Sequence, residues 1–308
     1  MTEDPPQHRQ VRINGIEVHV AEQGEGPLVL LLHGFPETWY SWRHQIGALA
    51  DAGFRAVAPD QRGYGGSDRP AAIDQYTIFH LVGDVVSLIR ALGENEAVIV
   101  GHDWGSMVAS NAALLRPDAV RGLVALSIPP LPRGPRPPMT ATKERFGAGF
   151  YQNYFQEPGV AESSLEKDVA TTLRLSYAGV RSLEPSGGFL GLFDEPDALP
   201  DWLTEADLAI FVAEFTASGF SGGLNWYRNL DRNWELMAAW QDQPITPLAL
   251  YISGESDAMR VVYPLDDPVR AILPNLRGVI DVPGCAHWTQ QERPQVVTDA
   301  LLEFLGAL

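Results

Sequence analysis

Cysteine is nearly absent from this chain of 308 residues, which contains only Cys285. A single cysteine excludes an intrachain disulfide framework and any metal site that is built from several cysteines. It also fits a reducing compartment. Residues 1–10 are polar and lack the apolar segment of a signal peptide. We therefore expect a cytoplasmic protein.

Long apolar runs and an excess of positive charge are missing as well. The apolar stretch 27–32 is strand-sized, and no run approaches membrane-spanning length. The 22 Lys and Arg face 39 Asp and Glu, which gives a formal net charge of −17. This acidic balance argues against nucleic acid and anionic membranes as partners. The sequence also contains no HExxH, Walker or GxGxxG pattern.

What is present is an alternation of short apolar strands and amphipathic helices. Residues 11–21 alternate around the turn signal Asn14-Gly15, which predicts two antiparallel edge strands. Further strands are predicted at 28–32, 55–58, 97–100, 120–127, 247–252 and 276–282, and helices at 39–50, 76–92, 107–116 and 294–305. This order indicates an α/β fold, with a mostly parallel sheet and helices on both faces.

Ligands of such sheets bind at the carboxyl ends of the strands. Four polar residues fall at predicted strand ends: His33, Asp60, Asp103 and Ser127. We therefore expect the functional site at this edge of the sheet.

The alternation stops at residue 129. The proline-rich stretch 129–138 cannot form regular structure and is interpreted as a linker. From about 140 to 243 the sequence is aromatic-rich and helical, with turns expected at Glu157-Pro158-Gly159 and Pro185-Ser186-Gly187-Gly188. We predict a core formed by residues 1–130 and 244–308, interrupted by an all-helical cap at 131–243.

One stretch, Gly101-His102-Asp103-Trp104-Gly105, lies between a buried strand and a helix. Strand, tight turn and helix are the context of a nucleophile elbow, in which glycines let neighbouring turns approach a side chain on strained backbone. The central residue is usually serine, but here it is Asp103. A carboxylate at this position attacks carbon and forms an ester on its own side chain. An ordinary strand-to-helix turn with Asp103 as cap is the alternative.

A base that follows this nucleophile in the chain must be His287, because it is the only one of seven histidines after the elbow. The order nucleophile, acid, histidine requires a carboxylate between them. We choose Asp257, which orients the imidazole and stabilises its charged form in this interpretation. Glu255 is the nearest rival, and residues 266–267 are expected to cap a helix or face solvent.

The motif His33-Gly34-Phe35-Pro36 ends a predicted strand beside the elbow strand. We predict that the backbone amides of Phe35 and Trp104 form an oxyanion hole. A tight strand exit is the alternative, since Gly34 and Pro36 also suit it.

These residues resemble the α/β-hydrolase fold and, within it, the soluble epoxide hydrolases. The resemblance covers nearly the whole chain from about residue 12. It rests on four core motifs: His33-Gly34-Phe35-Pro36-Glu37, Asp60-Gln61-Arg62-Gly63-Tyr64-Gly65, Gly101-His102-Asp103-Trp104-Gly105 and His287-Trp288-Thr289. The insert is similar to that family's cap in residues 151–159 and 225–229.

The resemblance implies roles for cap residues that spacing alone does not give. It implies that Tyr151 and Tyr227 hold the epoxide oxygen, with Tyr154 as a structural neighbour. We further expect Gln152, Trp104 and Phe35 to contact the substrate. The aromatic content of the insert favours an apolar epoxide, although these rings equally suit a cap core: Phe146, Phe150, Phe155, Phe189 and Trp226.

The implied reaction converts an apolar epoxide and water to a vicinal diol. Asp103 attacks one epoxide carbon while two phenols donate to the departing oxygen. His287, oriented by Asp257, then activates the water that hydrolyses the ester. Neither a metal nor another cofactor is required. The sequence is compatible with a homodimer.

Two rivals share the fold. Haloalkane dehalogenases also use an aspartate but bind halide through nitrogen donors, commonly an Asn at the place of Phe35 together with a Trp; here Trp104 is present and the Asn is not. Fluoroacetate dehalogenases carry arginines where this chain has Trp104 and Met107. A non-catalytic binding protein is disfavoured because Asp103, Asp257 and His287 are all intact.

Overall fold

The computed structural model describes residues 5–183 and 188–308, so most of the turn predicted at Pro185-Ser186-Gly187-Gly188 lies outside the described residues. Within them, an eight-stranded sheet has the order β1-β2-β4-β3-β5-β6-β7-β8. The strands are β1 Gln7–Ile13, β2 Ile16–Gln23, β3 Leu28–Leu32, β4 Arg55–Pro59, β5 Ala97–His102, β6 Val120–Leu126, β7 Leu248–Gly254 and β8 Leu276–Val282.

Pairing in the sheet follows the predicted pattern. The first two strands form an antiparallel hairpin whose turn residues Asn14 and Gly15 both have positive φ, 43° and 82°. Strand β2 pairs antiparallel with β4, and the remaining neighbours are parallel. Strands β3 and β5 are buried along their whole length, as expected where helices cover both faces of a parallel sheet.

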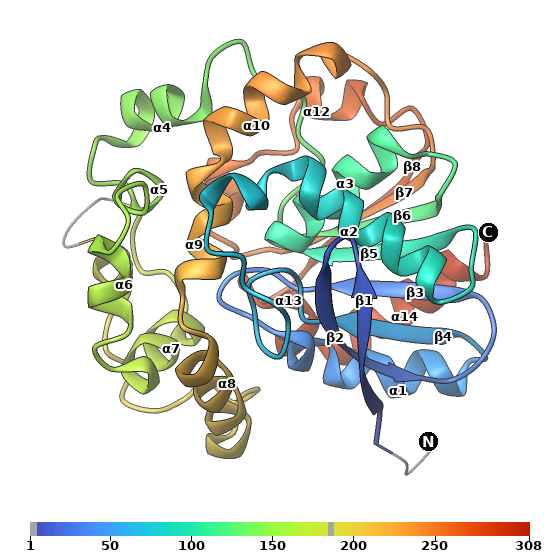
Figure 1. Cartoon of the computed structure of the whole chain (residues 1–308), viewed down its shortest axis with the longest axis horizontal. Coiled ribbons are helices and arrows are strands. Elements are labelled where there is room, and N and C mark those ends of the chain that lie inside the picture. Colours follow the sequence, from blue (N-terminus) through green and yellow to red (C-terminus); the bar gives the residue numbers. More distant parts are fainter. Residues whose placement is uncertain (1–4, 184–187) are drawn as a thin grey trace.

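Helices flank the sheet on both sides, as the sequence predicts (Figure 1). Helices α2 (Ile78–Ala91) and α3 (Trp104–Leu115) cover one face, and α1 (Arg43–Asp51) and α14 (Pro294–Leu305) cover the other. The two apolar layers are separate clusters of buried side chains, one on each side of the sheet. The observed bounds of α14 equal the predicted ones.

Between β6 and β7 the chain leaves the sheet and forms a helical layer at its edge (Figure 1). Its elements are α4 Pro138–Phe146, α5 Tyr151–Tyr154, α6 Val160–Leu165, α7 Val169–Ala178, η3 Leu190–Leu192, α8 Glu205–Ser218, α9 Ser221–Arg228, α10 Leu230–Leu236 and η4 Met237–Trp240. No strand occurs in the described part of this segment. The predicted linker is one residue too long, because Pro138 already forms the first turn of α4, where its missing N–H is not needed.

Short elements complete the described chain. They are η1 Trp39–Trp42, η2 Ile73–Tyr76, α11 Met259–Val262, α12 Asp267–Ala271 and α13 Thr289–Glu292. Asp266 accepts a hydrogen bond from the Val269 amide at the start of α12, which is the capping role expected for it. Across the described ranges, every helix is too short or too polar to pass through a lipid bilayer.

Candidate functional site

Asp103 occupies the turn between β5 and α3, with φ 52° and ψ −118°. A non-glycine residue in this region of backbone space is strained, and such strain is typical of functional turns. The flanking glycines are required by packing. A Cβ on Gly101 would collide with the Gly105 carbonyl, and one on Gly105 would collide with the Leu32 carbonyl. The local sequence thus forms a nucleophile-elbow geometry with a carboxylate at its tip.

The Asp103 carboxylate is held by backbone amides. The Phe35 N–H donates to Oδ1 at 3.0 Å, and the backbone amide of Trp104 lies where it lowers the pKa of this carboxyl. Burial raises the pKa of Asp103, while the charge of His287 and these amides offset part of the rise. The Phe35 amide, one of the two predicted oxyanion donors, therefore points at the group that would become an ester carbonyl.

His287 faces this carboxylate from the loop after β8. Its Nε2 atom lies 3.9 Å from Asp103 Oδ2, and its Nδ1 atom lies 3.2 Å from both carboxylate oxygens of Asp257. Burial alone lowers the pKa of His287, but Asp257 and Asp103 raise it to about 9. Burial raises the pKa of Asp257, yet His287 and Ser127 bring it down to about 2. The imidazole thus lies between two carboxyl groups, and both of them favour its charged form.

Ser127 belongs to this group, although sequence reasoning gave it no role. Its hydroxyl donates to Asp257 Oδ2 at 2.6 Å and lies 3.0 Å from His287 Nδ1. The Met259 amide donates to the other oxygen, Oδ1, at 2.8 Å. Its position at the carboxyl end of β6 indicated in the sequence that Ser127 lies near the site. Its contact with Asp257 could not be predicted, because the two residues are 130 positions apart.

Glu37 joins the loops around Asp103 from behind. Oε2 accepts from the Gly34 amide at 2.9 Å and lies 2.7 Å from His102 Nδ1. The other ring nitrogen of His102 bonds the His287 carbonyl at 2.8 Å. Burial raises the pKa of Glu37, but His102 outweighs it and lowers the pKa to about 2. Through these hydrogen bonds, the buried Glu37 carboxylate links the loop that contains Gly34 and Phe35 to His102 and, through His102, to the loop that contains His287.

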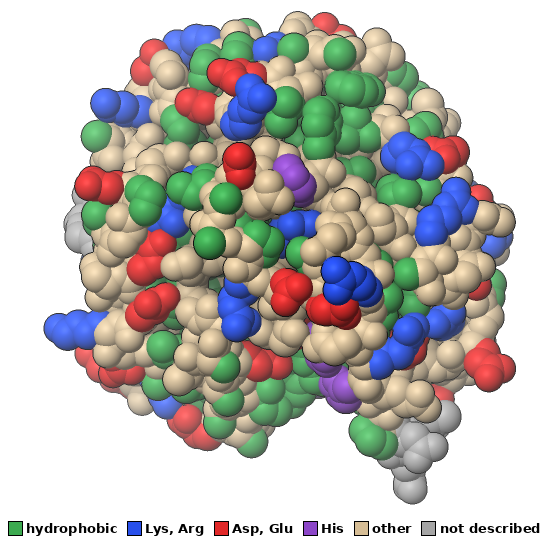
Figure 2. Space-filling view, viewed as in Figure 1, with side chains coloured by type: hydrophobic (Ala, Val, Ile, Leu, Met, Phe, Trp, Pro, Cys, Tyr) green, Lys and Arg blue, Asp and Glu red, His purple; other side chains and the backbone are tan. Residues whose placement is uncertain are grey.

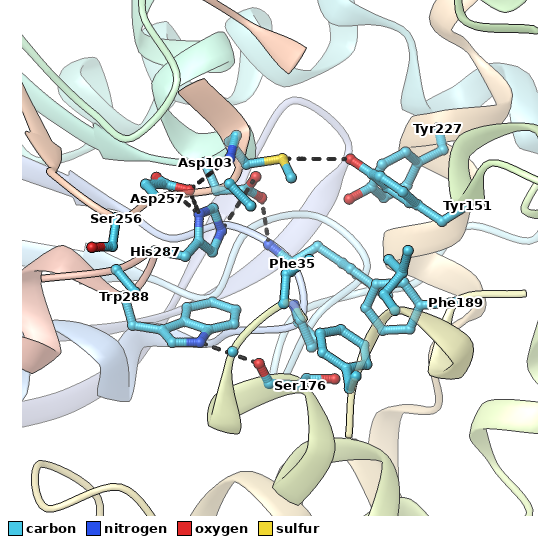
Figure 3. A pocket seen from close by; sticks show the side chains of 18 residues that line it. Phe35, Asp103, Tyr151, Ser176, Phe189, Tyr227, Ser256, Asp257, His287 and Trp288 are labelled. Carbon is cyan, nitrogen blue, oxygen red and sulfur yellow. Dashed lines mark hydrogen bonds and ion pairs between the residues drawn. The ribbon is translucent and has the colours of Figure 1, made fainter. Parts of the chain in front are cut away.

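Two phenols of the helical segment face Asp103 across a cavity (Figure 3). Tyr151 begins α5 and Tyr227 lies on α9, and Figure 3 shows both hydroxyls on the side facing Asp103. Burial raises the pKa of both phenols well above 10, and the charge of Asp103 adds to the rise. Both are therefore neutral hydrogen-bond donors at neutral pH.

The cavity between these groups is mainly apolar. Of the five aromatic residues proposed from the sequence, Phe189 lines it, while the other four are absent from its wall. Phe150, Phe155 and Trp226 are fully buried and form the core of the helical layer. Phe35 lines the cavity as predicted.

Two residues expected to contact the substrate do not line this cavity. Gln152 is 2% exposed and bonds the Tyr151 hydroxyl oxygen from behind. The Trp104 side chain packs edge-on against Tyr227 and lines a second cavity beside α3 and α10. Sequence motifs identified both positions, but the packing of the helical layer turns each side chain away from the space above Asp103.

Two other strand-end residues also lie apart from the cavity. His33 accepts from the Gln61 amide at 3.0 Å, and Asp60 bonds His19 at 2.8 Å and the Trp39 amide at 2.9 Å. They shape the loops around the site. Within residues 5–183 and 188–308 no cluster of three His, Cys, Asp or Glu side chains suits a metal ion.

The surface charge is dispersed. Acidic and basic side chains are intermixed over the face shown in Figure 2, despite the net charge of −17. The distribution on this face favours solubility over the binding of a polyelectrolyte.

Comparison with known proteins places the whole chain in one group. A family model of the alpha/beta hydrolase fold matches residues 27–294. Epoxide hydrolase A of Mycobacterium tuberculosis H37Rv is 47% identical, over 98% of each chain. Epoxide hydrolase 2 of Siraitia grosvenorii is 42% identical, over 97% of this chain and 98% of the relative.

Solved structures give the same result. The crystal structure of Epoxide Hydrolase A from Mycobacterium thermoresistibile matches with a TM-score of 0.94 and 46% identity, over 97% of this chain and 98% of that one. An epoxide hydrolase from an endophytic Streptomyces matches with a TM-score of 0.92 and 46% identity, over 99% and 96% of the two chains.

Proposed function

The chain belongs to the epoxide hydrolases of the α/β-hydrolase fold, and on that premise we propose that it converts an apolar epoxide to a vicinal diol through an ester on Asp103. The observation that carries this mechanism is the convergence of Asp103, His287 and two phenols on one apolar cavity. Water is the second substrate. We also propose a cytoplasmic location, since the single buried Cys285 fits a reducing compartment.

The first step opens the epoxide ring. A carboxylate oxygen of Asp103 attacks one ring carbon, and the C–O bond breaks toward the opposite side. Tyr151 and Tyr227 hydrogen-bond the ring oxygen and give it a proton as charge develops. Their raised pKa values keep both phenols protonated before this step.

The second step hydrolyses the ester. His287 removes a proton from water, which attacks the carbonyl carbon of the Asp103 ester, and Asp257 stabilises the imidazolium that forms. The Phe35 and Trp104 amides hold the tetrahedral oxyanion. Collapse of the tetrahedral intermediate then breaks the ester C–O bond, and the diol oxygen leaves with the proton held by His287. Loss of the Asp103 charge in the ester lowers the pKa of His287 from about 9, which makes the neutral base accessible at this stage.

The helical segment 131–243 acts as a cap in this proposal. It supplies both phenols and part of the apolar wall, while the sheet domain supplies the nucleophile, the base and the rest of that wall. Hydrogen bonds join the two parts, among them Tyr177 Oη to the Pro36 carbonyl at 2.8 Å and Trp226 Nε1 to the Arg62 carbonyl at 3.1 Å.

The dehalogenase alternative lacks support from the geometry. Phe35 offers no side-chain donor for a halide, and the Trp104 side chain is not among the described residues that line the cavity above Asp103. A non-catalytic role is also disfavoured, because the Asp103–His287–Asp257 geometry is intact. Halide release from a haloalkane at a rate above that of diol formation would favour the dehalogenase.

Single turnover of styrene oxide in ¹⁸O-labelled water tests the mechanism. With enzyme in excess, the first turnover is expected to place the label in the Asp103 carboxylate and to leave the diol unlabelled. Label that enters the diol in the first turnover would mean direct attack by water and would overturn the covalent mechanism.

A further inference from the structure

The side chain of Gln152 lies between two buried phenols. Its Nε2 atom is 3.2 Å from the Tyr151 hydroxyl oxygen and 2.6 Å from that of Tyr263. Gln152 is 2% exposed and does not line the cavity above Asp103. Because an amide NH₂ group can only donate, each phenol oxygen must accept at this contact.

Acceptance from Gln152 determines where the Tyr151 proton goes. A phenol has one proton to donate, and it cannot point toward an N–H that already points at the oxygen. On the cavity side, the acceptor near the hydroxyl is the Met259 thioether, 3.9 Å away. Sulfur of this type is a weak acceptor, so an epoxide oxygen in the cavity would readily replace it (Figure 3).

We propose that Gln152 is a positioning residue that orients the Tyr151 hydroxyl toward the epoxide oxygen and stabilises the phenolate left by ring opening. This inference rests on the proposed function. In this proposal Gln152 contacts the Tyr151 hydroxyl from outside the cavity, and not the substrate, as was expected from the sequence.

The ring-opening step shows what the amide contributes. The electron pair of the breaking C–O bond goes to the ring oxygen, which takes the Tyr151 proton and leaves a phenolate. The Gln152 N–H then donates to a charged acceptor, and such bonds are about twice as strong as neutral ones. Hydrolysis of the ester leaves the Asp103 carboxyl protonated. Transfer of this proton to the phenolate restores the Tyr151 hydroxyl and the Asp103 carboxylate.

The surroundings of Tyr227 are different. The ring of Trp104 packs edge to face against it, with centroids 5.1 Å apart. Burial raises the pKa of the Tyr227 phenol, and Trp104 offsets part of the rise. Gln152 therefore acts on Tyr151 and not on Tyr227.

The test compares Gln152→Met and Gln152→Glu with the wild type in single turnover of styrene oxide. Rapid quenching and mass spectrometry follow the alkyl-enzyme and give separate rate constants for its formation and hydrolysis. We expect Gln152→Met to slow formation roughly 10- to 100-fold, with hydrolysis within twofold of wild type, because Gln152 is not bonded to the His287 group. Asn153→Leu is the matched control, since this neighbouring amide donates to the Gly147 carbonyl at 3.4 Å and contacts neither phenol among the described hydrogen bonds, and it should keep the wild-type rates.

The Gln152→Glu variant separates orientation from packing. An ionised carboxylate only accepts, whereas a protonated one can donate to Tyr151. Its formation rate relative to Gln152→Met at the same pH should therefore rise as the pH falls. Equal rates for the two variants at every pH, or a wild-type formation rate in Gln152→Met, would overturn the proposal. Failure of the wild type to form any alkyl-enzyme would instead overturn the proposed function.

Discussion

The imidazole of His287 faces the carboxylate of Asp103 across 3.9 Å, measured from Nε2 to Oδ2. This distance is too long for a direct hydrogen bond, so the two groups attract each other by charge alone. In the proposed mechanism this gap leaves the Asp103 carboxylate free to attack an epoxide, with His287 beside it as the base for the later hydrolysis.

Replacement of His287 by Gln should separate the two chemical steps. Ring opening uses Asp103 and the phenols and should continue, whereas the ester should accumulate because no base activates water. Intact-protein mass spectrometry should show one equivalent of alkyl-enzyme after addition of styrene oxide. Steady-state turnover at the wild-type rate would remove His287 from the mechanism.

The charge on His287 should also appear in the pH dependence of stability. Its pKa is about 9 in the folded protein against an ordinary value of 6.5. A raised pKa stabilises the fold fully below about 6.5, and this contribution is lost as the pH rises through about 9. The difference in unfolding free energy between wild type and His287→Gln should therefore shrink from pH 6.5 to 9. Denaturant titrations at several pH values measure it, and a constant difference would contradict the assignment.

Removal of the Ser127 hydroxyl should weaken the base without abolishing it. Ser127→Ala deletes the 2.6 Å donor to Asp257 Oδ2 while the Met259 amide still holds Oδ1. The expected result is slower ester hydrolysis, by about 5- to 20-fold for a lost bond to a charged group. The rate of alkyl-enzyme formation should remain that of the wild type. A slowed formation step with normal hydrolysis would show that Ser127 acts elsewhere.

The sequence predicted what depends on local pattern. Apolar patterns predicted the six strands from residue 28 onward to within two residues at each end. They also predicted helices on both faces of the sheet. Motif spacing and chain order predicted Asp103 and His287 as a pair, and the structure places them 3.9 Å apart. Contacts between distant segments were not accessible. Gln152 meets Tyr263 across 111 residues, and nothing in either neighbourhood indicates the other. The orientation of a side chain within a motif is likewise set by tertiary packing, as Trp104 and Gln152 show.

A methyl group at position 34 should disturb the nucleophile directly. A Cβ on Gly34 would lie 2.5 Å from both Cβ and Oδ1 of Asp103, and neither can move without distorting the strained elbow. Gly34→Ala should therefore lower alkyl-enzyme formation by at least 100-fold, because small displacements of a nucleophile are costly. Circular dichroism should show a folded protein, and a normal rate would mean that the loop relaxes away from Asp103.

The phenols provide the most direct separation of this enzyme from a dehalogenase. An alkoxide is a poor leaving group, so ring opening without a proton donor is slow, and either phenol alone supplies one. Tyr151→Phe and Tyr227→Phe should each lower the formation rate of alkyl-enzyme by about 10- to 100-fold, and the double variant should lose it to the limit of detection. The control is the rate at which each single variant hydrolyses its own alkyl-enzyme. Both variants keep His287, so this rate should remain near that of the wild type. Near-normal ring opening by the double variant would show that the departing oxygen is stabilised elsewhere, and the proposed role of the cap would then be wrong.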